Sequence, residues 1–83
     1  MRCGNVAPTS IYDRAGYRNA QTVDHLRSNP SWFKCWVYGE YTGGGNYIWY
    51  YTYGDDHGNW GFVPAVKVYT DTDPAPGLPP CSF

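Results

Sequence analysis

The run Tyr47-Ile48-Trp49-Tyr50-Tyr51-Thr52-Tyr53 decides the fold expected for this 83-residue chain. Aromatic and β-branched side chains dominate the run and are typical of a strand. Because side chains alternate across a strand, Tyr47, Trp49, Tyr51 and Tyr53 share one face, and Ile48, Tyr50 and Thr52 share the other. Both faces are bulky, which indicates one face in the core and one aromatic, functional face.

A polar loop over residues 54–59 follows this strand, and residues 60–63 return the chain as a second strand. Pro64 ends that strand because proline has no N–H to give to a sheet. One 3₁₀ turn is expected near residues 64–66. Further short strands are expected over residues 9–14, 21–26, 32–41 and 66–69. Five or six short strands separated by turns favour a small all-β barrel or sandwich.

The composition supports one all-β domain and argues against two classes of partner. The chain has ten Gly and seven Pro, and 19% of its residues are aromatic. Six Lys and Arg face seven Asp and Glu, for a net charge of −1. Nucleic-acid binding and polybasic membrane binding both need a basic face, so we expect neither. No apolar run reaches the ~20 residues of a membrane span.

Three cysteines allow one disulfide in three pairings. Cys35 lies in a strand-like run, and Cys81 ends a Pro-rich tail that would otherwise be loose. A Cys35–Cys81 bridge would tie the tail to the core and contribute roughly 4 kcal/mol by chain entropy. It would indicate an oxidising compartment, whereas an intracellular chain would keep three reduced thiols. Cys3 would remain as a free thiol, as a bridge to another chain, or as the partner of a segment not present here.

The sequence carries no apolar secretory leader. If the protein is exported, we therefore expect its signal peptide to have been removed before Met1.

Two stretches resemble the Src-homology-3 (SH3) family: Ile48-Trp49-Tyr50-Tyr51, and Asn59-Trp60-Gly61-Phe62-Val63-Pro64-Ala65-Val66-Lys67-Val68. The family's late hairpin begins a strand at a Trp. After a loop it continues with Gly-aromatic-Val-Pro-small, a 3₁₀ turn and a closing strand. Residues 10–81 are most similar to the bacterial SH3 branch, in particular to small secreted actinobacterial proteins with a Cys in the central strand and a Pro-rich tail ending in Cys.

The resemblance implies a five- to six-stranded SH3-like barrel with a disulfide-tethered tail. Residues 1–9 would be an irregular N-terminal arm, residues 10–69 the barrel, and residues 70–83 the tail pinned by Cys81. The early segment departs from the bacterial pattern: residues 12–17 keep Arg14 and Gly16 but lack the usual Ser and Pro.

Catalytic and metal-binding patterns are weak, and we expect a non-enzyme without cofactor or metal. Asp24 and His25 are adjacent and Ser28 is near, but no strained nucleophile turn accompanies them, so a surface His-Asp pair is the better interpretation. Catalysis by a Cys-His pair would compete with the disulfide for Cys35. No Cys or His spacing fits zinc. Acidic residues at 55–56 and 71–73 are interpreted as solvated turns.

Sixteen rings (nine Tyr, four Trp and three Phe) exceed what a small barrel core holds. Surplus Tyr and Trp at the surface would supply rigid contact area with a polar end. The alternative is that all the rings pack the barrel and the tail. The expected ligand-binding residues are Tyr12, Tyr17, Trp49, Tyr51, Tyr53 and Pro64.

Two functions follow as hypotheses. In the first, the chain is a secreted, non-catalytic binding module that recognises cell-wall peptidoglycan or a peptide, as bacterial SH3 domains do. In the second, it is an adaptor subunit or an inhibitor of a secreted hydrolase that docks on a partner protein. Residues 1–9 would be disordered in the first case and ordered by the partner in the second.

Overall fold

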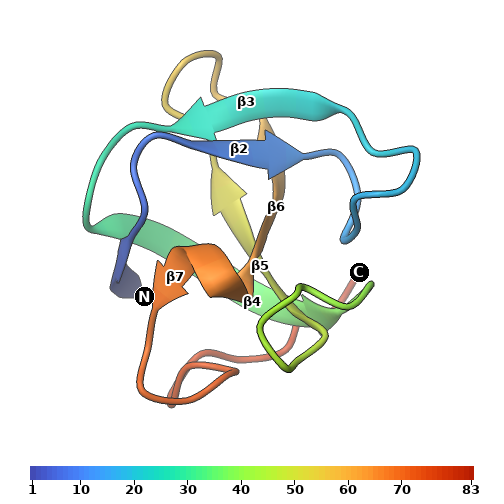
Figure 1. The fold of residues 1–83 in the computed structure, drawn as a ribbon. Coiled ribbons are helices and arrows are strands. Elements are labelled where there is room, and N and C mark those ends of the chain that lie inside the picture. The colour runs from blue at the N-terminus through green and yellow to red at the C-terminus, as the bar shows by residue number, and fades with distance from the viewer.

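The chain is all-β in a computed structural model that describes residues 1–83, as the sequence predicts (Figure 1). Its one helical element is a short 3₁₀ turn, and no helix has the length and hydropathy that crossing a bilayer requires. The elements in chain order are β1 (Arg2–Asn5), β2 (Thr9–Tyr12), β3 (Thr22–Leu26), β4 (Ser31–Tyr38), β5 (Ile48–Tyr53), β6 (Trp60–Pro64), η1 (Ala65–Lys67) and β7 (Val68–Tyr69).

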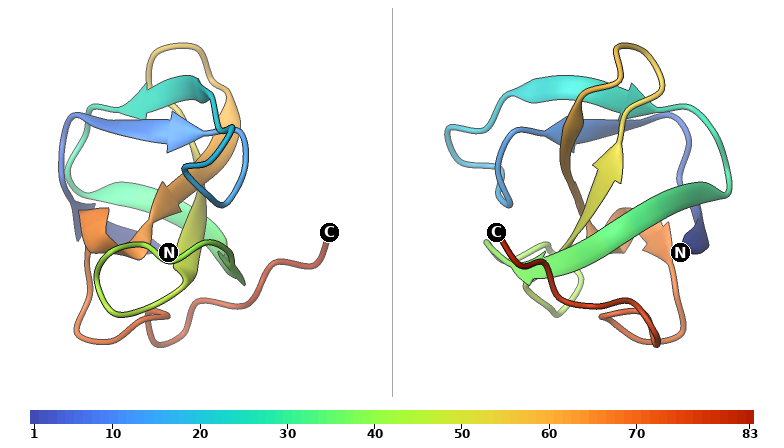
Figure 2. Two further views of the ribbon diagram at one scale, coloured as in Figure 1. Left: turned by 45° about the vertical axis from the view of Figure 1, so that its right-hand side comes forward. Right: turned by 180° about the vertical axis from the view of Figure 1, so that it is seen from behind.

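All seven strands belong to one antiparallel sheet with the order β3-β2-β6-β5-β4-β1-β7. The sheet is not closed, because β3 and β7 pair on one side only, and the pairing does not confirm the expected SH3-like barrel of five to six strands. The sheet bends strongly, and the β2–β3 hairpin lies opposite β4 in all views (Figure 2). Register shifts in β2 and β4 add to this bend, as bulges do.

β1 corrects the expectation of an irregular arm over residues 1–9. Arg2 pairs with Trp32 of β4, and Gly4 pairs with Tyr69 of β7. Asn5 is buried, and its side-chain amide donates to the carbonyls of Val6 and Ser28 at 2.9 Å each. Pairing with two distant strands makes this segment a strand. Its own four residues show no strand-like alternation of apolar side chains.

The other expected strands are present with small changes of boundary, and the 3₁₀ turn follows Pro64 as expected. The last strand is shorter than expected, because η1 takes up residues 65–67. Inward-facing Ile48, Tyr50 and Thr52 of β5 are at most 3% exposed. The first two share the interior with the wholly or almost wholly buried side chains Ile11, Leu26, Phe33 and Val63.

The tail is part of the fold. Cys35 and Cys81 form the expected disulfide, with Cα atoms 4.9 Å apart. The backbone N–H of Trp36 donates to Pro79 and that of Cys81 donates back to Trp36, so the tail runs along β4 (Figure 2). Ala75 and Leu78 enter the core. Cys3 is free and buried.

Candidate functional site

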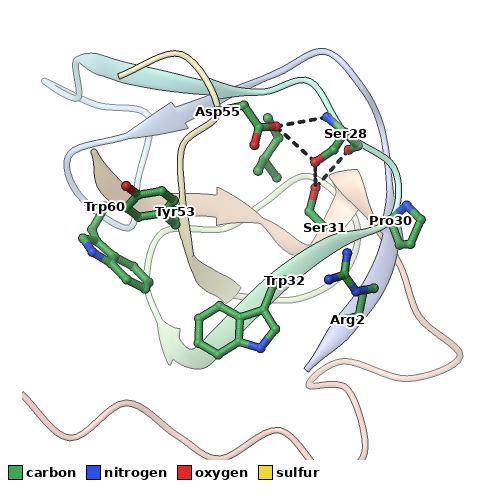
Figure 3. Close-up of a pocket in the computed structure, with 9 residues that line it drawn as sticks. Arg2, Ser28, Pro30, Ser31, Trp32, Tyr53, Asp55 and Trp60 are labelled. Atoms are coloured by element: carbon green, nitrogen blue, oxygen red, sulfur yellow. Dashed lines mark hydrogen bonds between the residues drawn. The ribbon is translucent and has the colours of Figure 1, made fainter. Parts of the chain in front are cut away.

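The main hollow of the surface is an open groove of about 500 Å³ where β1, β4 and two loops meet (Figure 3). That volume lies within the roughly 300–1,000 Å³ typical of small-ligand sites. Trp32, Tyr53 and Trp60 form an aromatic wall. The polar wall consists of Arg2 of β1, Ser31 of β4 and the loop residues Ser28 and Asp55, and Leu26 and Pro30 complete the lining.

The aromatic wall follows from strand register. Tyr53 and Trp60 are direct cross-strand partners, and their rings meet at 5.3 Å. Trp60 also meets Trp32 edge to face at 6.2 Å and stacks on Tyr51 at 5.2 Å and 16°. Such ring pairs hold one another in place. The three wall residues still keep 42–51% of their surface exposed, so they offer ordered apolar area to a ligand.

The indole N–H groups separate the four tryptophans into two kinds. The N–H of Trp36 donates to the Leu78 carbonyl at 3.1 Å, and that of Trp49 donates to the Glu40 carbonyl at 2.8 Å. The N–H groups of Trp32 and Trp60 have no partner within the chain. The two tryptophans that line the groove are therefore the two with a free donor.

Asp55 is the fixed point of the polar wall. Its Oδ2 accepts the backbone N–H of Arg27 at 2.7 Å and that of Ser28 at 3.0 Å. The Ser28 hydroxyl donates to the same oxygen at 3.1 Å, and the Ser31 hydroxyl donates to the Ser28 carbonyl at 2.9 Å. Oδ1 of Asp55 accepts no hydrogen bond from the chain. One carboxylate oxygen thus holds the loop and the other is free.

Asp24 is buried, and its carboxylate binds the backbone of the β5–β6 loop. This corrects the expectation of a surface His-Asp pair. Asp24 is 1% exposed and accepts four backbone N–H groups. Burial alone would raise the pKa of Asp24, but these four hydrogen bonds outweigh burial and hold the pKa well below its usual range. The donors are His25, Asp56, His57 and Asn59, at 2.7–3.0 Å.

No catalytic triad forms around Asp24. Both of its carboxylate oxygens are occupied by backbone donors. His25 instead faces Asp56, with Nδ1 3.2 Å from Oδ2, and Ser28 bonds Asp55 and Ser31. The Arg27 guanidinium binds Asp56 through two nitrogens and lowers its pKa. No three His, Cys, Asp or Glu side chains gather as a metal site.

Two of the expected ligand-binding residues are buried and present no surface to a ligand. Trp49 is 0% exposed, and Pro64 is among the fully buried side chains. The rings of Tyr12 and Tyr17 cover Trp49 at 6.1 and 5.0 Å. The hydroxyl of Tyr17 is engaged too, since it donates to the Thr42 carbonyl at 2.8 Å. The rings of Tyr12, Tyr17 and Trp49 pack together in a cluster that lies outside the groove.

Of the remaining expected residues, Tyr53 lines the groove and Tyr51 lies beside it. Tyr51 is half-buried among Trp60, Phe62 and Phe83, with ring centroids 5.0–5.2 Å away. The sequence interpretation missed Trp32, Trp60, Arg2 and Asp55 as site residues. A signal for two of them was present, since Trp32 and Trp60 each stand where a turn gives way to a strand.

Comparison with known proteins adds no relative. No family model, curated protein or solved structure matches this chain.

Proposed function

We propose that the protein is a secreted, non-catalytic binding module of the bacterial SH3 type, and that its groove recognises cell-wall peptidoglycan or a peptide. The observation that carries the proposal is the pair of exposed groove tryptophans with free N–H groups. An exposed ring that is held in place and keeps an unpaired donor is suited to stack on a ligand and hydrogen-bond to it at once.

Three features support an SH3-like fold for this module. The β5–β6 hairpin carries Trp49 in its first strand and Gly61, Phe62 and Val63 in its second. The 3₁₀ turn η1 comes directly before the last strand, β7, which pairs with β1 at the start of the chain. The open pairing of the sheet is consistent with a partly open barrel.

Export is supported by the Cys35–Cys81 disulfide, because such bridges persist in oxidising compartments. A non-catalytic role is supported by the polar side chains near the groove, whose partners are mostly structural. Asp24, Asp56 and Ser28 each hold a loop rather than pointing a free group at a shared reaction centre.

Sedimentation with purified bacterial cell walls tests the proposal. We expect micromolar protein to be retained in the pellet, and the Trp32→Ala/Trp60→Ala variant to remain largely in solution. Tyr38→Ala is the matched control, since Tyr38 is 74% exposed and lies outside the groove. Circular dichroism verifies that each variant is folded. No retention of the wild-type protein, or equal retention of the Trp variant, would sink the cell-wall proposal.

A partner protein is the second candidate, and a second aromatic patch favours it. The rings of Tyr41 and Tyr47 lie 5.4 Å apart beside the glycine-rich loop after β4, and the two residues are 52% and 56% exposed. Exposed Tyr is enriched at protein interfaces. Affinity purification from the native secretome tests this role, with one stoichiometric partner, lost in a Tyr41→Ala/Tyr47→Ala variant, as the expected result. The order of residues 1–9 no longer separates the two functions, because the chain's own β4 and β7 order Arg2–Asn5.

A further inference from the structure

The groove contains two opposite charges that do not neutralise each other. Arg2 and Asp55 both line it, and Figure 3 shows them on either side of Ser31. Three ion pairs form in the chain, and neither residue belongs to any of them. The guanidinium of Arg2 also has no hydrogen-bond partner. A cation and an anion are therefore both available to a ligand in the same groove.

The anionic end is oriented by the loop around it. Three donors hold Oδ2 of Asp55, so Oδ1 keeps a fixed position without the cost of ordering a long side chain. Arg27 donates its backbone N–H to Asp55, but its guanidinium is occupied by Asp56. Oδ1 is thus an unshared acceptor suited to an ammonium group.

The aromatic wall of the same groove provides apolar contact and hydrogen-bond donors. The indole N–H groups of Trp32 and Trp60 have no partner in the chain, and neither does the hydroxyl of Tyr53. Main-chain carbonyls of a peptide are acceptors that these donors match. The serine hydroxyls opposite are already engaged with each other and with Asp55. A neutral ligand would leave both charges unused.

We infer that the groove binds a short peptide by its two charged ends, with the free ammonium group at Oδ1 of Asp55 and a carboxylate at Arg2. The inference rests on the proposed function and specifies the ligand of the same groove. Two or three residues suit a hollow of about 500 Å³, with an apolar side chain against the aromatic wall.

Four forms of one tripeptide test the inference. Ala-Leu-Ala is titrated with both ends free, N-acetylated, C-amidated, or blocked at both ends, and binding is followed by tryptophan fluorescence and by calorimetry. An exposed charge pair contributes modestly to binding, and a pair shielded from water contributes more. We therefore expect each block to weaken binding by roughly three- to tenfold.

Two charge variants assign each end of the peptide to its residue. Asp55→Asn should abolish the effect of N-acetylation and keep the effect of amidation, and Arg2→Gln should do the reverse, as in a double-mutant cycle. Asp71→Asn and Arg18→Gln are the controls, since both residues are exposed and their side chains have no partner in the chain.

The outcomes separate this inference from the proposed function. If the unblocked peptide fails to bind at millimolar concentration, or if blocking its ends changes nothing, the inference is overturned. The same holds if either blocking effect persists in its variant. Cell-wall retention that depends on Trp32 and Trp60 but not on Arg2 or Asp55 would overturn the inference and leave the proposed function standing. Cell-wall retention that does not depend on Trp32 and Trp60 would overturn both the inference and the proposed function.

Discussion

The backbone N–H of Asn59 donates to Oδ2 of Asp24 at 2.9 Å across 35 residues of sequence. The side-chain amide of Asn59 adds a second bond, to the Val23 carbonyl, also at 2.9 Å. These contacts fix the end of the β5–β6 loop to β3. Asp55 lies in that loop and Trp60 follows it. The hydrogen bonds of the loop to buried Asp24 therefore position one residue of each wall of the groove.

Replacing Asp24 with Asn should destabilise the protein. An amide has one acceptor oxygen where the carboxylate has two, and its NH₂ would face backbone donors. Leaving buried donors without an acceptor is costly, and we expect the Tm to fall by roughly 5–10 °C. Thermal unfolding followed by circular dichroism measures the change. Asp71→Asn removes an exposed charge that has no partner, and should leave the Tm within error of wild type.

Acid should weaken the fold through the same residue. In the folded protein the pKa of Asp24 is lowered, whereas in the unfolded chain it lies near the ordinary value of about 3.9. The unfolded state thus binds a proton first as the pH falls. The stabilising contribution is complete above about pH 5 and is lost progressively as the pH drops below about 4. Urea midpoints measured from pH 6 to 2 should fall more steeply for wild type than for Asp24→Asn. Parallel curves would contradict this role.

Thiol reactivity should depend on unfolding. Burial raises the pKa of the Cys3 thiol, and a buried neutral thiol reacts slowly. Labelling followed by intact mass should find no modified thiol in the native protein, one in denaturant, and three in denaturant with reductant. Rapid labelling of the native protein would show that β1 opens readily, in conflict with its pairing to β4 and β7.

The disulfide should contribute about 4 kcal/mol to stability, because it closes a separation of 46 residues. Cys35→Ser/Cys81→Ser is expected to lower the free energy of unfolding by roughly that amount in urea titrations. It should also loosen Phe83 from its contacts with Tyr51 and Phe62. A change below about 1 kcal/mol would mean that the tail is held mainly by Ala75, Leu78 and the hydrogen bonds to Trp36.

Local sequence patterns were sufficient for six of the seven strands. Alternating rings, glycine-rich turns and Pro64 are short-range signals, and they marked β2 to β7. β1 carries no such signal, since its residues become a strand only by pairing with β4 and β7. The disulfide could also be predicted from the sequence, because a tail without periodicity is loose unless something attaches it to the core.

The exposure of individual rings was beyond those patterns. Alternation placed Trp49 on the same face as Tyr51 and Tyr53, but it could not show that Tyr12 of β2 and Tyr17 of the following loop cover that one ring. Asp24 is a similar case. Its burial follows from a loop that begins thirty residues later in sequence and supplies three of its four donors. Local patterns therefore do not predict which rings remain exposed where long-range packing decides it.

Trp49 and Trp60 should respond in opposite ways to truncation. Trp49 is fully buried and donates to the Glu40 carbonyl, so Trp49→Ala should cost about 3–5 kcal/mol of unfolding free energy. Trp60 is 42% exposed and contributes mainly ring contacts, so Trp60→Ala should cost about 1 kcal/mol. Urea titrations give both values, and retention on cell walls gives the second readout.

Trp60→Ala should remain folded and lose retention on cell walls. A Trp49→Ala protein assayed well below its urea midpoint should keep most of its retention, because Trp49 presents no surface to a ligand. The reverse pattern would return the binding site to the Tyr12–Tyr17–Trp49 cluster.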